Sequence, residues 1–200
     1  MCSQLIKMLE KNIGVFNTVM EIGVGDGRFI NYIKEKKWIG INKYIGIDIN
    51  NEQVEENKLN FNNIEFVCEE IEEWVKRDTS NGGVFISAGT LSYFTSNELK
   101  ELLGLIKSKY KFVSFGIIEP ISFDLNTEFE SMPRGNLMYS HNYPFIFKSL
   151  GYDIISQSVL TFDDVFNLSD SPDKKIRASF VSRLPIWKCN TIRLFLSNAT

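Results

Sequence analysis

Length, composition and charge place this chain among globular proteins that fold as one domain. It has 200 residues, of which 44% are apolar and 13% aromatic, enough to bury a core without disulfides or metal. The formal net charge of −3 argues against a general nucleic-acid binder, which carries a basic excess.

Short apolar runs and helical segments alternate along the first two thirds of the chain. The apolar runs predict β-strands at residues 18–22, 44–49, 64–68, 84–88 and 112–118. Helices are predicted at residues 28–37, 51–59, 69–76 and 97–107. The last helix is the clearest, because four apolar residues recur with helical spacing and Ser96 can cap it. Strands separated by such helices predict right-handed crossovers and a mostly parallel, doubly wound sheet.

The alternation changes after the fifth strand. Residues 119–140 contain turn-forming residues and mixed charge without a clean period, and we interpret them as a long substrate loop or cap over the strand ends. A helix is predicted at 141–150, ended by Gly151. Strands are expected at 152–160 and 176–183, as an antiparallel pair at the sheet edge, and the tail from residue 184 has no assignment. Residues 1–200 are therefore expected to form a single α/β domain.

A glycine-rich turn follows the first strand. Residues 19–28 read VMEIGVGDGR, so a strand ends, the chain turns through Gly23, Gly25 and Gly27, and a helix begins. Glycines allow a tight turn and the close approach of a ligand, and a helix N-terminus presents free amides. The G-x-G-x-G spacing differs from the NAD fingerprint, G-x-G-x-x-G, whose third glycine is replaced here by Arg28. For this segment alone, a structural turn in another α/β protein is the alternative interpretation.

Together with Glu21, this segment resembles motif I of class I S-adenosylmethionine-dependent methyltransferases, E-x-G-x-G-x-G. The resemblance implies a three-layer, Rossmann-like class I methyltransferase fold, with a mostly parallel central sheet and an antiparallel edge strand. It also implies that the glycine turn underlies the methionine portion of S-adenosylmethionine, and that Glu21 positions a water or amine near it. The expected product of the cofactor is S-adenosylhomocysteine.

The ends of the second and third strands extend this predicted cofactor site. Asp48 follows the glycine loop by about 20 residues, the separation expected for a carboxylate that accepts hydrogen bonds from the ribose hydroxyls. Ile49 comes next and could pack on one face of the adenine. By resemblance to the family, Glu70 takes the adenine amino group and Ile71 flanks the ring, with Glu69 as the alternative one residue earlier.

The fourth strand should end beside the transferable methyl group, because ligands of open parallel sheets lie beyond the carboxyl ends of the strands. Its small residues Ser87 and Ala88 leave room for the sulfonium. The segment 87–92 contains no acidic residue to hold magnesium and no cysteine for attack on a cytosine ring. It also lacks the Asn/Asp-Pro-Pro-aromatic sequence of enzymes that methylate the amino groups of DNA bases.

Fewer residues point to the acceptor. His141 is the only histidine and would suit a base because its ordinary pKa is near neutrality, with a surface or capping role as the equal alternative. Glu119 could orient an acceptor or be structural. Tyr93, Tyr143 and Arg134 are the expected substrate contacts.

These observations favour metal-independent methyl transfer to a small-molecule acceptor, with a hydroxyl of a sugar or other small metabolite preferred over nitrogen. The alternatives are a protein or RNA methyltransferase that works with a partner, and a scaffold that binds the cofactor without catalysis. Basic residues between 174 and 193 are interpreted as a solvated surface or a crevice for an anionic substrate.

The three cysteines are far apart in the sequence, which argues against a disulfide framework or zinc site and favours a reducing cytoplasm. The first twelve residues lack the apolar core of a signal peptide, and no apolar run is long enough for a membrane span. A cytoplasmic monomer or homodimer without a membrane or nucleic-acid partner is therefore expected.

Overall fold

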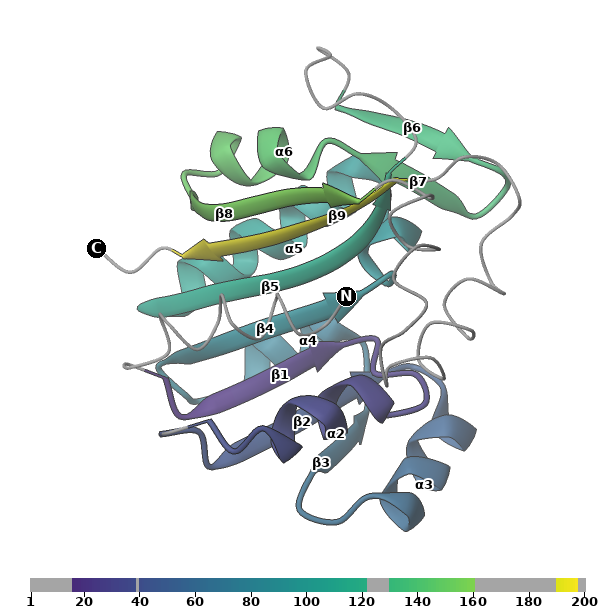
Figure 1. Cartoon of the computed structure of the whole chain (residues 1–200), viewed down its shortest axis with the longest axis vertical. Helices are drawn as coiled ribbons and strands as arrows, with labels where there is room; N and C mark the ends of the chain where they lie inside the picture. The colour runs from purple at the N-terminus through teal and green to yellow at the C-terminus, as the bar shows by residue number, and fades with distance from the viewer. Residues whose placement is uncertain (1–15, 39, 122–129, 161–189, 198–200) are drawn as a thin grey trace.

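The apolar runs form a seven-stranded sheet in the computed structural model, which describes residues 16–38, 40–121, 130–160 and 190–197 (Figure 1). Its strands lie in the order β3-β2-β1-β4-β5-β9-β8. All neighbours pair in parallel except β9, which is antiparallel to both β5 and β8. The strands are β1 (Thr18–Ile22), β2 (Lys43–Asp48), β3 (Glu65–Cys68), β4 (Gly82–Ala88), β5 (Phe112–Ile121), β8 (Asp153–Leu160) and β9 (Asn190–Ser197).

Helices cover both faces of this sheet and make a three-layer α/β domain (Figure 1). On one face α2 and α3 pack through residues such as Ile30 and Val54, and on the other α4, α5 and α6 pack through residues such as Trp74 and Leu102. The fold predicted from the sequence is confirmed. The helices are α2 (Arg28–Glu35), α3 (Asn51–Asn60), α4 (Ile71–Arg77), α5 (Ser96–Lys109) and α6 (Tyr143–Ser149), with a 3₁₀ turn, η1, at Leu91–Tyr93.

The expected antiparallel pair at the sheet edge is present, but its second strand differs from the prediction. β8 matches the run expected at 152–160, and it pairs with β9, in the tail that received no assignment. The strand expected at 176–183 lies outside the described residues.

Residues 119–140 are not one long loop, contrary to the interpretation of the sequence. Glu119, Pro120 and Ile121 prolong β5, where they pair with β9. Further along, β6 (Ser131–Arg134) and β7 (Met138–His141) form an antiparallel hairpin, while residues 122–129 lie outside the described residues. The hairpin lies near the ends of β4 and β5 (Figure 1). A role of this segment as a cap over the substrate stays a prediction.

The N-terminus of α5 was predicted one residue too late. Thr95, not Ser96, is the N-cap, since its hydroxyl accepts from the amide of Glu98 while the Glu98 carboxylate accepts from the amide of Thr95. This reciprocal pair is a capping box. The Ser96 hydroxyl donates instead to Glu130.

Gly104, in the interior of α5, offers a test of helix stability. An added Cβ would have no heavy atom within 4 Å, and the backbone there is helical. Glycine in a helix costs roughly 0.5–1 kcal/mol relative to alanine. Gly104→Ala should therefore raise the free energy of unfolding by about that amount, measured by urea denaturation. A destabilised variant would contradict this packing of α5.

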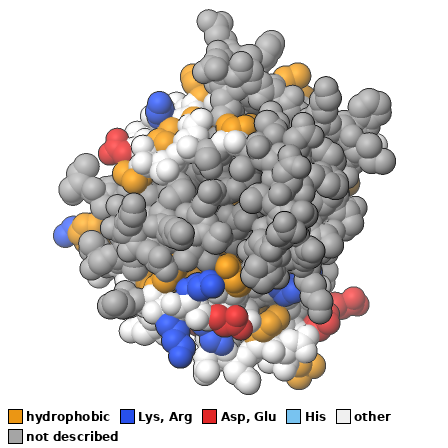
Figure 2. All heavy atoms as spheres, viewed as in Figure 1, with side chains coloured by type: hydrophobic (Ala, Val, Ile, Leu, Met, Phe, Trp, Pro, Cys, Tyr) orange, Lys and Arg blue, Asp and Glu red, His pale blue; other side chains and the backbone are white. Residues whose placement is uncertain are grey.

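The surface near α2 and α3 carries charged side chains of both signs. In the region of α2 and α3, Lys and Arg side chains lie among Asp and Glu side chains on the face seen in Figure 2, in line with the small net charge. Among the described residues, no helix combines the length and apolar character needed to cross a membrane.

Candidate functional site

The ends of the central strands create the candidate site. β1 pairs with β2 on one side and β4 on the other, so the strand order reverses at β1. In open α/β sheets ligands bind beyond the carboxyl ends of the strands at such a switch point. The glycine turn leaves β1 here, Asp48 ends β2, and η1 follows β4.

The glycine turn has the backbone that its sequence predicts. Gly23, Gly25 and Gly27 all have positive φ, at +65°, +49° and +71°. A Cβ on Gly23 would lie 2.2 Å from Thr90 Oγ1, so the turn packs directly against the segment after β4. A Cβ on Gly25 would meet nothing within 4 Å. The turn is thus closely packed at Gly23 and has open space beside Gly25, where a ligand could approach.

Asp48 joins the end of β2 to the glycine turn. Its Oδ2 accepts from the amide of Gly25 at 2.8 Å, and its Oδ1 accepts from the amide of Asn50 at 2.9 Å. A carboxylate oxygen can accept more than one hydrogen bond, so this partly exposed group can also receive ribose hydroxyls. Ile49 beside it is 66% exposed, a large apolar surface that an adenine would cover.

Replacing Asp48 with alanine should weaken S-adenosylhomocysteine binding without unfolding the protein. Charge-assisted hydrogen bonds contribute about 1.5–3 kcal/mol each, so the dissociation constant should rise by roughly 10- to 150-fold. Titration calorimetry measures this. Lys43 is an exposed residue of the same strand, and Lys43→Gln serves as the control that should leave the affinity unchanged. If Asp48→Ala also left the affinity unchanged, the ribose would have to bind elsewhere.

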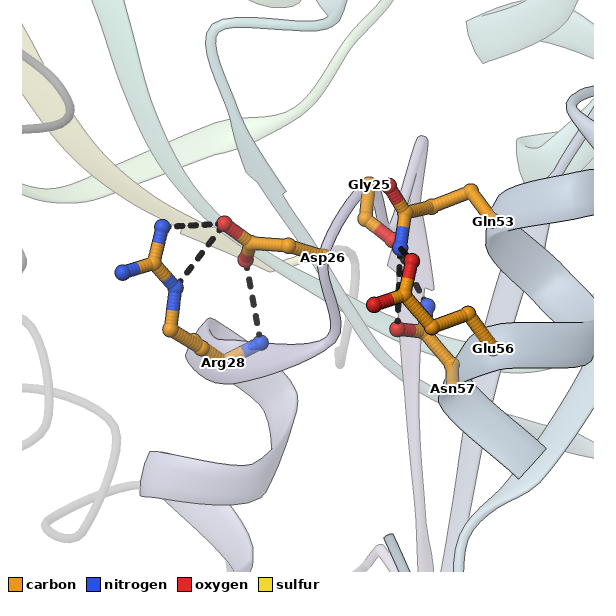
Figure 3. A network of polar contacts seen from close by, with 6 residues as sticks. All are labelled: Gly25, Asp26, Arg28, Gln53, Glu56 and Asn57. Carbon is orange, nitrogen blue, oxygen red and sulfur yellow. Dashed lines mark hydrogen bonds and ion pairs between the residues drawn. The ribbon is translucent and has the colours of Figure 1, made fainter. Parts of the chain in front are cut away.

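Asn57 supports the turn from α3, and the sequence analysis missed it. Its Nδ2 donates to the Gly25 carbonyl at 2.6 Å, and Gln53 Nε2 donates to Asn57 Oδ1 at 3.4 Å (Figure 3). Asn57 is 1% exposed and, with Val54, occupies the inner side of an otherwise polar helix. The sequence signal for this role was that Asn57 follows Val54 by three positions and therefore shares its buried face of the helix. On the other side of the turn, Arg28 forms an ion pair with Asp26 (Figure 3).

Glu21 lies beneath the turn. It is 2% exposed, and its Oε2 accepts from the amide of Ile30 at 2.9 Å, which ties α2 to β1. Burial raises the pKa of Glu21 well above its usual value, partly opposed by that hydrogen bond. The structure therefore gives Glu21 a role in holding α2, and its contact with a cofactor amine stays a prediction.

The acidic segment after β3 borders a cavity of about 280 Å³. Glu70 lines the cavity, whereas the Glu69 carboxylate is engaged by Arg77, whose Nε lies 2.7 Å from Oε2. This arrangement favours the register that names Glu70. Ile71 is buried in the core under α4, so little of its side chain remains for a ligand. The cavity is lined by Glu70, Glu72, Tyr93, Phe94 and Glu98, and of these the predicted substrate contact Tyr93 is 60% exposed.

A buried carboxyl, that of Glu119, lies at the end of β4. Its Oε1 accepts from the Ser87 hydroxyl at 2.6 Å and from the amide of Leu91 at 3.1 Å. Ala88 pairs with Ile118, so Glu119 is the next residue of β5 beyond the end of β4. The side chain is 0% exposed, and burial raises the pKa of Glu119 to about 7 even though these hydrogen bonds oppose the shift.

His141 is the last residue of β7 and is fully buried, so the prediction that it begins a helix is wrong. Asn142 caps α6, which begins at Tyr143. His141 Nε2 lies 3.0 Å from the carbonyl oxygen of Phe94, and because a carbonyl only accepts, Nε2 carries the proton. Burial lowers the pKa of His141, so the ring is held neutral.

The other predicted substrate residues, Tyr143 and Arg134, lie at the start of α6 and at the end of β6. The Tyr143 ring is fully buried and lies 5.4 Å from the His141 ring. Burial raises the pKa of Tyr143, the Glu119 charge raises it further, and the Arg134 charge opposes this. Both charged groups therefore act on the Tyr143 hydroxyl.

Buried polar atoms without a hydrogen-bond partner gather in this part of the described chain. Such atoms are rare in folded proteins and mark places for water or a ligand. Five of the six lie on β5, the β6–β7 hairpin or α6: Glu119 Oε2, Ser131 Oγ, Arg134 Nη1, His141 Nδ1 and Tyr143 Oη. Among the described residues, no group of three or more His, Cys, Asp or Glu side chains could hold a metal ion.

Comparison with known proteins is consistent with this geometry. Residues 19–111 match a family model described as a methyltransferase domain. No curated protein sequence shows a significant match.

Solved structures share the fold over nearly the whole chain. An S-adenosylmethionine-dependent methyltransferase from Mesorhizobium loti has a TM-score of 0.64 at 13% identity, covering 98% of this chain and 96% of that one. Burkholderia thailandensis 1,6-didemethyltoxoflavin-N1-methyltransferase, with bound 1,6-didemethyltoxoflavin and S-adenosylhomocysteine, has a TM-score of 0.63 at 14% identity, covering 98% and 77%. A Haloferax volcanii protein in complex with the Trm112 methyltransferase activator has a TM-score of 0.60 at 15% identity, covering 94% and 86%. At these identities the likeness concerns the fold.

Proposed function

We propose that the chain is a class I S-adenosylmethionine-dependent methyltransferase that methylates a hydroxyl of a small-molecule acceptor, a sugar or other small metabolite, without a metal ion. The cofactor is S-adenosylmethionine, which when bound supplies a methyl group on a sulfonium. The residues present fit it: the open face of Gly25 can receive the methionine portion, the Asp48 carboxylate the ribose, and Ile49 and Glu70 the adenine.

The observation that carries the hydroxyl acceptor is the buried Glu119 carboxyl at the end of β4. Its Oε1 is held by Ser87 and Leu91, while its Oε2 has no partner among the described residues. A hydroxyl nucleophile must lose a proton during methyl transfer, and a base works best when its pKa lies near the operating pH. Glu119 has that pKa, at about 7.

Glu119 Oε2 is therefore the proposed proton acceptor. Bound S-adenosylmethionine would supply the methyl group and keep the electron pair of the carbon–sulfur bond as S-adenosylhomocysteine, and Glu119 Oε2 would take the proton that the acceptor hydroxyl loses. In this proposal η1 and the glycine turn would orient the acceptor and the cofactor, since alignment of the reacting groups is the main catalytic requirement of a displacement.

His141 receives a different role in this proposal. The His141 Nε2–H donates to the Phe94 carbonyl, and the His141 ring is fully buried beside Tyr143. We assign it to holding the β6–β7 hairpin against the segment after η1. Glu119 instead accepts from the Leu91 amide of η1 and from the Ser87 hydroxyl at the expected methyl position.

Titration calorimetry with S-adenosylhomocysteine, and NADH as the comparison, tests the proposal first. Micromolar binding of S-adenosylhomocysteine alone is expected, and release of this product would then be followed with hydroxylated sugars, acids and phenols as acceptors. Failure to bind would favour a scaffold, or a methyltransferase whose site a partner completes.

We also propose a cytoplasmic location, because the three cysteines are widely spaced and Cys68 is free.

A further inference from the structure

The Gly25 peptide in the glycine turn is held by side chains on both sides. Earlier in the turn the Gly23 amide donates to the Ile47 carbonyl at 2.9 Å, so the backbone of β2 fixes that part. At Gly25 the amide donates instead to Asp48 Oδ2 at 2.8 Å. The Gly25 carbonyl accepts from Asn57 Nδ2 at 2.6 Å (Figure 3). The orientation of this peptide therefore depends on two side chains, one at the end of β2 and one on α3.

These contacts belong to a closed ring of hydrogen bonds that begins and ends at the Asp48 carboxylate. From Oδ2 the ring runs through the Gly25 peptide to Asn57, whose Oδ1 accepts from Gln53 Nε2 at 3.4 Å. The Gln53 amide donates to Asn50 Oδ1 at 3.3 Å, and the Asn50 amide donates to Asp48 Oδ1 at 2.9 Å. The ring thus joins the glycine turn, the end of β2 and the first two turns of α3.

The Asp48 carboxylate keeps acceptor positions for a ligand within this ring. A carboxylate has about four lone-pair positions, divided between its two oxygens. The ring uses one position on each oxygen, since Oδ2 accepts from Gly25 and Oδ1 accepts from Asn50. Each oxygen can therefore still accept a hydrogen bond, in a direction that the ring fixes. This arrangement suits the two neighbouring hydroxyls of a ribose.

Asn57 is the buried member of the ring. It is 1% exposed, and its two hydrogen bonds orient the amide group, with Oδ1 towards Gln53 and Nδ2 towards Gly25. An apolar side chain such as that of Val54 would serve helix packing alone without the penalty of burying an amide.

We propose that Asn57 is a positioning residue for S-adenosylmethionine. Through the Gly25 peptide it holds the Asp48 carboxylate in the direction that receives the ribose. The inference rests on the proposed placement of the ribose at Asp48. Hydrogen bonds that form a network support one another, so the loss of the Asn57 amide is expected to act on the distant carboxylate.

The test is titration calorimetry on the full chain with two ligands, S-adenosylhomocysteine and its 2′-deoxy analogue, which lacks one ribose hydroxyl. The wild type should bind S-adenosylhomocysteine more tightly, because the missing hydroxyl no longer donates to Asp48. Asn57→Ala should weaken binding of S-adenosylhomocysteine by about threefold to tenfold, the effect of one neutral hydrogen bond. The 2′-deoxy analogue should lose less affinity, so the preference for the ribose hydroxyl should fall.

Val54→Ala is the matched control, because Val54 is buried on the same face of α3 and its side chain is apolar. It should lower the free energy of unfolding, measured by urea denaturation, and keep the preference for the ribose hydroxyl. Gln53→Met is a second test that holds even if Asn57→Ala fails to fold. Gln53 is only half-buried, and methionine keeps its length but removes the donor to Asn57. This variant should also lower the preference, by less than Asn57→Ala does.

A double-mutant cycle shows whether Asn57 acts through Asp48. When Asp48 is already alanine, Asn57→Ala should have little further effect on the affinity for S-adenosylhomocysteine, because residues of one hydrogen-bond network are not additive. An effect as large as in the wild type would mean that Asn57 does not act through the carboxylate, and would overturn the inference.

The remaining outcomes separate this inference from the proposed function. A normal ligand preference in Asn57→Ala or in Gln53→Met, or an equal loss of preference in Val54→Ala, would overturn the positioning role. In these cases weaker binding by Asp48→Ala would leave the ribose at Asp48. A wild type that binds both ligands equally, or an Asp48→Ala variant with normal affinity, would contradict the proposed ribose placement and this inference together.

Discussion

Gly23→Ala should destroy the cofactor site. The alanine Cβ would lie 2.2 Å from Thr90 Oγ1 and 2.3 Å from Thr90 Cγ2, and the backbone at φ +65° is unfavourable for any residue with a Cβ. Left-handed backbone costs roughly 1–2 kcal/mol, and overpacking adds about 1–3 kcal/mol. We expect the free energy of unfolding to fall by about 2–5 kcal/mol and S-adenosylhomocysteine binding to weaken more than tenfold.

Two further variants assign this effect to the contact with Thr90. Thr90→Ala removes the two nearest atoms and leaves its Cβ at 2.7 Å, so combining it with Gly23→Ala should recover part of the stability. Gly25→Ala carries the strain of φ +49° without any contact within 4 Å, and it should be more stable than Gly23→Ala. Denaturation and calorimetry on the same samples provide both readouts. Wild-type binding by Gly23→Ala would mean that the turn and the Thr90 segment are not packed in this way.

The parallel half of the sheet was predictable because its strands are buried on both faces. Runs such as residues 84–88 and 112–118 are apolar without alternation, and helices of regular spacing separate them, so both the elements and their order follow from local pattern. The reversed strand β9 was not predictable in this way. Its pairing with β5 joins residues such as Ser114 and Ser197, which are far apart in the chain, and local pattern carries no information about such a pairing.

The hairpin was missed for a different reason. Pro133 lies within β6, and a proline lowers the expectation of a strand, although it is tolerated in a two-stranded ribbon where one edge has no partner. The residues of the short strands β6 and β7 also have a composition typical of loops. Consequently His141 was placed at a helix start, when it is the last residue of β7.

The glycine turn and Asp48 were predictable because backbone conformation and strand ends leave a local signature in sequence. The burial of Glu119 and Tyr143 was not predictable in this way. These residues belong to β5 and α6, and their burial depends on tertiary packing that local sequence pattern does not show.

Glu119→Gln should stop catalysis while sparing the cofactor site. The Gln carbonyl can still accept from Ser87 and Leu91, so η1 keeps its position, but the amide cannot take the hydroxyl proton. A general base contributes about 100- to 10,000-fold, and kcat should fall by that factor while the affinity for S-adenosylhomocysteine changes by less than about threefold. Glu55→Gln, an exposed residue of α3, is the control and should leave both values unchanged. A Glu119→Gln enzyme with normal kcat would assign the proton to another group.

The pH dependence gives the same variant a second, independent readout. Burial raises the pKa of Glu119 from 4.5 to about 7, so between these values the folded chain holds a proton that the unfolded chain has released. This proton stabilises the fold at low pH, and its contribution is lost as pH rises to about 7, an effect on the order of 3 kcal/mol. Denaturation at pH 5 and pH 8 should therefore show a larger loss in the wild type than in Glu119→Gln. Glu21 also has a raised pKa, but it is present in both proteins and cancels in the comparison. Catalysis needs the unprotonated carboxylate, so wild-type kcat should rise through pH 7 as stability falls. Parallel stability curves for the two proteins, or a kcat independent of pH in this range, would remove Glu119 from the proposed role.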